Sequence, residues 1–183
     1  MKQGDVLRKE RENKGLSVEE TAGKLGIPPE EYQEIEAGNS PAEEWGFRLA
    51  QIAIQLAVPT SRLLAESGKF ADCKPGQAGL RIQTVRKEKA AYSEEVAKQK
   101  GMSLEDYKKV QDERDGYPRH KTPEEIAAAM GISIEEYREV EAGTSPVEKY
   151  GPLFLGFAEA IEQPVFNLFY PCGLPFQELD DYP

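Results

Sequence analysis

Histidine and cysteine are scarce in this chain of 183 residues, which contains one histidine and two cysteines. His120 is therefore expected to be a loop residue, and the widely separated Cys73 and Cys172 are expected to be free thiols. Clusters of histidine, cysteine and acidic residues at metal-ligand spacing are missing, so the sequence predicts no metal site and no cofactor. A glycine-rich phosphate loop and a nucleophile elbow are missing as well, which argues against an enzyme.

Long apolar runs are also missing. A membrane span needs roughly 20 mostly apolar residues, and the longest apolar stretch, residues 151–171, is interrupted by Glu159, Glu162 and Pro164. This stretch is typical of a buried helix followed by a turn. The N-terminus lacks the apolar region of a secretory signal. Together these features predict a cytoplasmic protein.

Positive charge is in short supply, with 23 Lys and Arg against 33 Asp and Glu and a net charge of -10. The acidic residues concentrate in residues 122–183, whereas residues 80–121 are net basic. Affinity for nucleic acid depends on neutralising phosphates. The overall charge therefore argues against an ordinary nucleic-acid-binding protein.

The sequence does contain an internal repeat. Residues 16–64 align with residues 121–169 at a constant offset of 105, giving 19 identities in 49 positions without a gap. The best-matched blocks are "EEYQEIEAGNSP" (30–41) and "EEYREVEAGTSP" (135–146). A weaker third echo, "EEVAKQKGMSLEDY" (94–107), follows the same spacing. The pattern indicates duplication.

Each copy has the pattern of two short helices joined by a tight turn. A Glu-rich helix start is followed by an alanine, a glycine and later a tyrosine. Glycine can take the left-handed conformation that ends one helix and turns the chain into the next, and alanine lets two helices cross closely. The residues concerned are Ala22, Gly26, Tyr32, Ala127, Gly131 and Tyr137. This arrangement predicts a helix-turn-helix in each copy.

Helix ends are marked in both copies. Ser17, Thr122 and Ser133 are each followed three residues later by glutamate, as in a capping box. Gly38 and Gly143 fit C-terminal caps because a proline follows three residues later. An amphipathic stretch after each stop predicts further helices. The sequence therefore predicts an all-α fold of two tandem units, each with four to five short helices.

These two units define the predicted domains. The first covers residues 1–66, and residues 67–79, rich in small residues and breakers, form a linker. The second covers residues 80–170 and carries an extra N-terminal helical segment. Within it, a helix over residues 103–114 is expected to double as the first helix of the second unit. The C-terminal tail, residues 171–183, is expected to pack on the second unit or to be presented to a partner.

The first unit resembles the lambda-repressor-like helix-turn-helix family, the Xre class of bacterial and phage regulators. The resemblance rests on "LRKERENKGLSVEETAGKLGIPPEEYQEIEAGNSP" and "LAQIAIQLAVPTSRLL", and in the second unit on "KTPEEIAAAMGISIEEYREVEAGTSP". It covers about residues 4–66 and 103–169. It implies sequence-specific binding of double-stranded DNA, with the second helix of each pair, the reader helix, in the major groove. Two units in one chain would then mimic the two-fold pair that such proteins form by dimerising.

The resemblance also implies which residues contact DNA. Those near base edges are Pro28, Pro29, Glu30 and Gln33 in the first unit and Ser133, Ile134, Glu135 and Arg138 in the second. Phosphate contacts are implied for Ser17, Val18, Asn39, Thr122, Pro123 and Thr144. A basic region between residues 81 and 100 includes Arg86, Lys87 and Lys89. It is interpreted as a solvated helix face, as a patch that docks the acidic last third, or as a phosphate-contacting surface.

Both reader helices depart from the family pattern because they are acidic. Residues 28–37 hold four glutamates and no basic residue, and residues 133–142 hold four glutamates against Arg138 alone. Helix capping and the helix dipole account for glutamates in the first turn. The others favour an alternative function, a repurposed helix-turn-helix scaffold that binds a basic protein or mimics nucleic acid. A homodimer is a further partner to consider.

Overall fold

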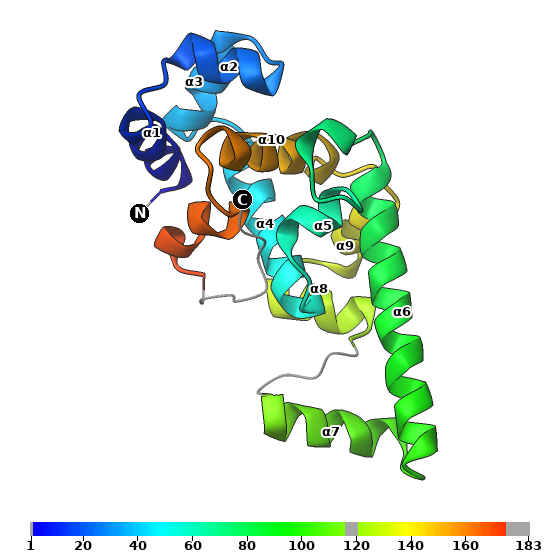
Figure 1. Cartoon of the computed structure of the whole chain (residues 1–183). Helices are drawn as coiled ribbons and strands as arrows, with labels where there is room; N and C mark the ends of the chain where they lie inside the picture. Colours follow the sequence, from blue (N-terminus) through cyan, green and yellow to red (C-terminus); the bar gives the residue numbers. More distant parts are fainter. Residues whose placement is uncertain (1, 116–120, 175–183) are drawn as a thin grey trace.

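The computed structural model describes residues 2–115 and 121–174, whose regular secondary structure is helical throughout (Figure 1). The first half contains α1 (Gln3–Asn13), α2 (Val18–Leu25), α3 (Pro29–Ala37), α4 (Ala42–Leu56), α5 (Thr60–Leu64) and the 3-10 helix η1 (Phe70–Asp72). The second half contains α6 (Gln77–Gln99), α7 (Leu104–Asp115), α8 (Pro123–Met130), α9 (Ile134–Glu141), α10 (Val147–Ala160), η2 (Val165–Leu168) and η3 (Tyr170–Cys172). The predicted all-α class is confirmed. His120 and the tail beyond residue 174 lie outside the described residues.

The α2–α3 and α8–α9 pairs have the same local structure. Ser17 Oγ accepts a hydrogen bond from the Glu20 backbone N–H at 3.0 Å, and the Glu20 carboxylate accepts one from the Ser17 N–H, also at 3.0 Å. Thr122 and its own third-position glutamate form the same capping box. Gly26 ends α2 with φ of 73°, a left-handed conformation that favours glycine. The predicted capping boxes at Ser17 and Thr122 are confirmed, whereas of the capping box at Ser133 only the bond from the Glu136 N–H is formed, and α9 has its C-cap at Ala142, one residue before Gly143.

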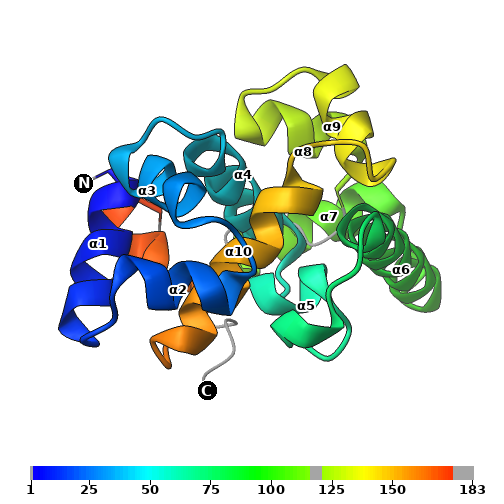
Figure 2. The ribbon, with the colours of Figure 1, turned by 90° about the horizontal axis from the view of Figure 1, so that it is seen from above.

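The helix after each pair packs on the opposite half of the chain. α10 packs on α2 and α4, and α4 packs on α8 and α10. Phe157 of α10 stacks on Tyr32 of α3, with ring centroids 6.4 Å apart. Figure 2 shows α10 crossing the molecule from the second half to lie beside α2. Only residues 39–41 separate the cap of α3 from α4.

Two glycines allow α4 and α10 to cross closely. A Cβ on Gly46 would lie 2.1 Å from Cε2 of the Phe154 ring. A Cβ on Gly151 would lie 3.1 Å from Cδ2 of Leu49. Gly46 and Gly151 are equivalent in the repeat, as are Leu49 and Phe154. The crossing is therefore a pseudo-two-fold contact in which each helix offers a glycine to a large side chain of the other.

In the second half, α6 occupies the place that α1 has in the first, since α1 packs on α3 and α6 packs on α9. Gly4 and Gly79 make the equivalent close approaches. A Cβ would meet the Glu36 carbonyl oxygen at 2.1 Å in the first half and the Val140 carbonyl oxygen at 2.2 Å in the second. The expectation that residues 103–114 form the first helix of the second unit is therefore wrong. That segment is helical, as α7, but its main packing is on α6.

The length of α6 has a cause in the sequence. At an offset of 75, Gly4 and Arg11 of α1 match Gly79 and Arg86 of α6. Gly15, which separates α1 from α2 with φ of 74°, matches Ala90. Alanine has the highest helix propensity, so α6 continues through Ala90, whereas α1 ends before the equivalent Gly15. The third echo is the end of this long helix together with α7.

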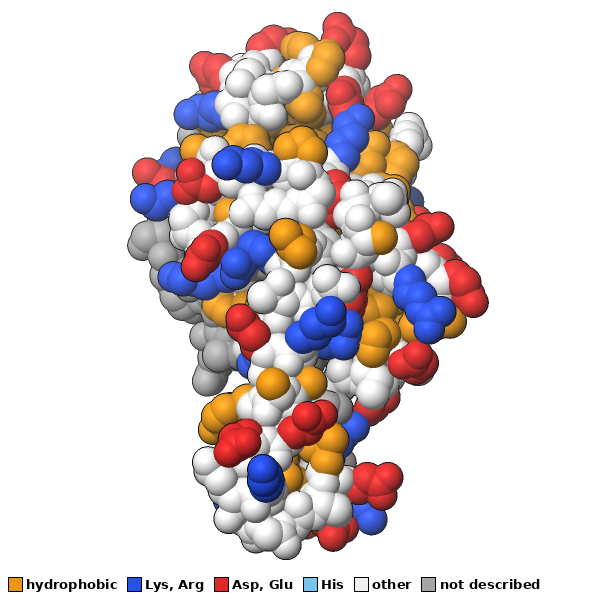
Figure 3. All heavy atoms as spheres, turned by 90° about the vertical axis from the view of Figure 1, so that its right-hand side faces the viewer, with side chains coloured by type: hydrophobic (Ala, Val, Ile, Leu, Met, Phe, Trp, Pro, Cys, Tyr) orange, Lys and Arg blue, Asp and Glu red, His pale blue; other side chains and the backbone are white. Residues whose placement is uncertain are grey.

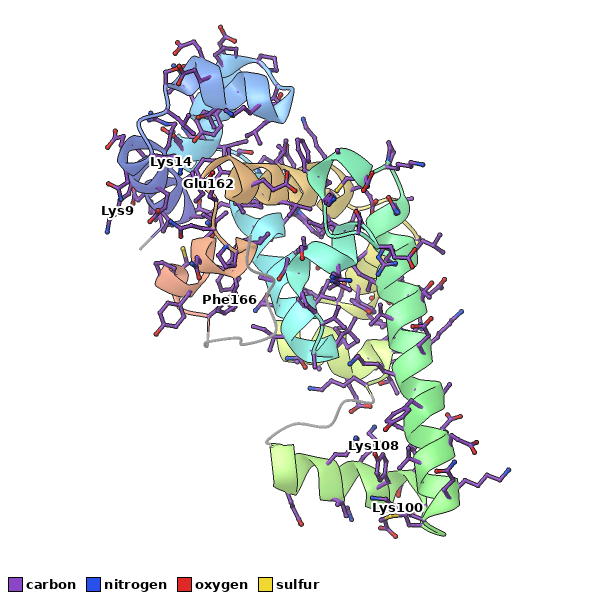
Figure 4. The ribbon with its side chains drawn as sticks, in the orientation of Figure 1. Lys9, Lys14, Lys100, Lys108, Glu162 and Phe166 are labelled. Carbon is purple, nitrogen blue, oxygen red and sulfur yellow. The ribbon has the colours of Figure 1, made fainter. Side chains whose placement is uncertain are left out.

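The arm made by the end of α6 and α7 lacks the covering helices of the other two pairs. Val110 of α7 is 44% exposed, whereas the matching Ile35 and Val140 are 5% and 0% exposed. Lys108 of α7 reaches Glu125 of α8, with Nζ and Oε1 2.9 Å apart; Figure 4 shows this lysine on α7. The arm is thus an incomplete repeat that projects from the body.

The crossing predicts that Gly46→Ala destabilises the protein. The new methyl group has no room beside the buried Phe154 ring, and overpacking of this kind costs about 1–3 kcal/mol. Because the halves share the crossing, we expect one cooperative transition in urea, seen alike by circular dichroism and by Trp45 fluorescence. Gly23→Ala is the matched control: a Cβ there meets nothing within 4 Å, and the change should stabilise α2 by roughly 0.5–1 kcal/mol. Two separate transitions, or equal effects of the two substitutions, would contradict the shared crossing.

Candidate nucleic-acid interface

The two reader helices, α3 and α9, present matching surfaces. Figure 1 shows them at the two flanks of the α4–α10 crossing, α3 above α10 and α9 below it. Gln33 of α3 and Arg138 of α9 occupy equivalent positions and are both exposed. The exposed glutamates beside them are also equivalent: Glu30, Glu34, Glu135 and Glu139. The structure therefore exposes the sequence-predicted residues Gln33 and Arg138 at equivalent positions of two equivalent helices.

The hydroxyl groups predicted to contact DNA take part in helix ends, those of Ser17, Thr122 and Thr144 toward phosphate and that of Ser133 toward base edges. Ser17 and Thr122 cap α2 and α8, and Ser133 Oγ accepts a hydrogen bond from the Glu136 N–H at 3.1 Å. Thr144 Oγ1 donates to the Glu139 carbonyl oxygen at 3.3 Å. Asn39 lies exposed just after α3. Apart from Asn39, these predicted contact residues already have structural roles at the edges of the two pairs.

The three basic residues predicted from the region 81–100 do not act as a group. Arg86 forms a two-pronged ion pair with Glu141, at 2.7 and 2.8 Å, and only 15% of its side chain is exposed. Lys89 Nζ donates to the Ala57 carbonyl oxygen at 3.4 Å, and Lys87 is exposed. Figure 3 shows basic and acidic side chains interspersed along this face. Arg86 thus serves the packing of α6 on α9.

Half of the glutamates on the reader helices have partners that sequence reasoning missed. Glu36 pairs with Arg11 of α1 at 2.6 Å, as Glu141 does with the equivalent arginine of α6. In the first turn, Glu31 pairs with Lys149 of α10 at 2.8 Å, and Glu136 pairs with Arg48 of α4 at 3.0 Å. Arg11 and Arg86 could have indicated these pairs from the sequence. They are 75 residues apart, however, and so do not align in the main repeat, whose offset is 105.

The Arg11–Glu36 pair is buried, with side-chain exposures of 11% and 5%. Burial alone would raise the pKa of Glu36, but the hydrogen bonds and charge of Arg11 outweigh burial and lower it. Burial and the nearby Glu36 carboxylate raise the pKa of Tyr32. The hydrogen bond from Arg11 to Glu36 in turn raises the pKa of Arg11. The glutamate is therefore ionised and holds α1 against the end of α3.

Arg138 is held much less firmly than Arg11 or Arg86. Its Nη2 lies 3.5 Å from Oε1 of Glu124, and the two side chains are 66% and 62% exposed. Exposed pairs of this kind contribute about 0–1 kcal/mol. A ligand can therefore replace Glu124 as the partner of this guanidinium.

Metal and membrane sites find no support in the part of the chain that the structure covers. Across residues 2–115 and 121–174, no three histidine, cysteine or acidic side chains come together as a metal-binding group. Within the same ranges, no helix is both long and apolar enough to cross a membrane. Cys73 and Cys172 are free and partly buried. The exposed reader helices remain the strongest candidate site.

Comparison with known proteins identifies the first half. Residues 7–53 match a family model described as helix-turn-helix (HTH_3), which extends from α1 into α4 and covers about a quarter of the chain. No curated protein and no solved structure matches the chain. The first half therefore carries a helix-turn-helix segment, consistent with the resemblance found in the sequence.

The buried pair predicts a defined effect of pH on stability. Because the pKa of Glu36 is lowered in the folded state, its stabilising effect is present above its ordinary value of 4.5 and is lost as the pH falls below it. Glu36→Gln should therefore lower the free energy of unfolding at pH 7 by about 3 kcal/mol and flatten its decline between pH 5 and pH 3. Urea titrations across this range measure both effects. Glu34→Gln, on the exposed face of the same helix, is the control. An unchanged pH profile in Glu36→Gln would count against the ion pair.

Proposed function

We propose that this protein is a cytoplasmic DNA-binding regulator with two tandem Xre-like helix-turn-helix copies in one chain, and that it is not an enzyme. The observation that carries the proposal is the matching exposure of equivalent residues on α3 and α9, which flank a pseudo-two-fold crossing of α4 and α10. Helix-turn-helix proteins use two such helices to read two half-sites. The helix-turn-helix match over residues 7–53 supports the first copy, and the shared caps and close approaches support the second.

The domain boundaries belong to the same proposal. The first copy covers residues 1–66, and the second covers residues 80–170. The intervening residues 67–79 include η1 and the start of α6. Since α4 and α10 are exchanged between the copies, the two fold as one interlocked unit. The arm formed by α7 and the end of α6 is an insertion within the second copy.

The charge of the reader helices sets how strongly DNA is held. Lys24 on α2 and Arg138 on α9 are exposed. The exposed Lys149 and Arg8 beside α3 already pair with its glutamates Glu31 and Glu36. The slope of affinity against salt reports the number of phosphates neutralised. We therefore propose modest affinity with a shallow salt dependence, in which base contacts supply more of the binding than is usual for DNA-binding proteins.

A second function is favoured by one specific observation. The four exposed glutamates occupy identical positions in both copies, and like charges repel phosphate. They would attract a basic protein instead. In this alternative the chain is a helix-turn-helix scaffold whose reader surfaces bind a basic partner.

One variant separates the two functions, because neutralising the exposed glutamates has opposite effects on them. We expect the quadruple Glu→Gln variant at positions 30, 34, 135 and 139 to raise affinity for duplex DNA about tenfold at low salt, since it removes repulsion from phosphates. Fluorescence anisotropy with mixed-sequence duplexes measures the change. The control carries the same four changes at exposed glutamates outside the reader helices: Glu66, Glu88, Glu94 and Glu105.

The outcomes are distinct. A gain confined to the reader variant supports DNA binding by α3 and α9, and equal gains in both variants reject it. If neither the wild type nor the variant binds any duplex at low salt, the regulator proposal fails. Suppose that a basic protein co-purifies with the wild type after nuclease treatment. Its loss from the reader variant alone would establish the scaffold.

A further inference from the structure

The two reader surfaces are equivalent in shape and unequal in chemistry. At the equivalent position, α3 carries Gln33 and α9 carries Arg138, and both are exposed. The exposed neighbours one turn before and one residue after are glutamates in both copies. The two surfaces therefore differ at a position where side-chain chemistry decides which base is read.

This difference belongs to one folded unit because each half is packed against helices of the other. α4 and α10 cross at Gly46 and Gly151, and ion pairs join each to the opposite reader helix. Lys149 of α10 holds Glu31, and Arg48 of α4 holds Glu136. A further, exposed pair joins Lys14, just after α1, to Glu162 after α10 at 2.6 Å (Figure 4). One chain thus presents both surfaces in a single order.

Glutamine and arginine read different bases in the major groove. Glutamine pairs with the N6 and N7 atoms of adenine, and arginine pairs with the O6 and N7 atoms of guanine. Arg138 is free to make such a contact because its exposed ion pair with Glu124 is weak. The matching Gln33 lies on an equally exposed helix surface. Each copy therefore favours a different base pair at the same place in its half-site.

We infer that the ligand of this protein is a non-palindromic DNA site with two unequal half-sites in fixed order, adenine being read by Gln33 and guanine by Arg138. The inference rests on the proposed function, and it goes further by naming the kind of site and the two residues that make its halves differ. A symmetric homodimer would present the same residue twice and select a palindrome. The single chain instead presents Gln33 in one copy and Arg138 in the other.

Selection from randomised duplexes with the full-length chain tests the inference. The wild type should enrich a site whose two halves differ at one base pair, A·T in one half and G·C in the other. Gln33→Arg should convert the first preference to G·C and make the enriched site palindromic, and Arg138→Gln should do the reverse. Each change should alter the preference at that base pair by roughly 5- to 100-fold in competition assays.

Gln99→Arg is the control, since Gln99 is exposed near the end of α6 and away from both reader helices. It adds the same charge and should leave the selected sequence unchanged. A palindromic wild-type site, or a Gln33→Arg variant with the wild-type preference, overturns the inference while DNA binding stands. Failure to enrich any duplex removes the proposed function itself, and the inference falls with it.

Discussion

The close crossing of α4 and α10 is the contact on which the rest of the structure depends. Gly46 receives the Phe154 ring, and Gly151 receives Leu49, so two long helices approach where larger residues would force them apart. Each helix then continues into the opposite half and completes its core. Phe157, for example, reaches Tyr32. Across the residues that the structure describes, the two halves consequently share one hydrophobic core, and this crossing is central to how α3 and α9 are oriented.

A second constraint decides which helix covers α9. Arg86 of α6 needs a carboxylate, and the positions equivalent to Glu36 are Glu141 on α9 and Gln111 on α7. Only Glu141 supplies the charge, and it binds the guanidinium with two hydrogen bonds. An arginine left buried without a partner would cost several kcal/mol. This one residue difference therefore favours packing of α6 on α9 and leaves α7 in the projecting arm.

Sequence reasoning predicts the local structure well and the long-range packing poorly. The caps at Ser17 and Thr122 and the turn glycines Gly26 and Gly131 depend on residues only a few positions apart, so they are readable from the sequence. The exchange of α4 and α10 is not readable, because duplicated helices have apolar faces that suit either half. The match of α1 to α6 has an offset of 75 residues, whereas the main repeat has an offset of 105. Because the offset changes within the arm, an alignment at 105 does not reveal that α6 corresponds to α1. Gln33 and Arg138 are exposed as expected. Of the interpretations of the basic region, Arg86 agrees with docking on the acidic last third, since it binds Glu141.

The acidity of the reader helices has two separate origins. Glu31, Glu36 and their equivalents are explained by packing, since each binds a lysine or arginine of another helix. Glu30, Glu34 and their equivalents face solvent, and no packing role accounts for them. Carboxylates there repel phosphate at every sequence, yet they accept hydrogen bonds from the amino group of cytosine. Such a surface penalises non-specific DNA more than a matched site, and specificity is the difference between those two affinities. If this chain binds DNA, its glutamates lower affinity in general and increase discrimination, so a negative charge of this size is compatible with a selective reader and incompatible with a strong non-specific one.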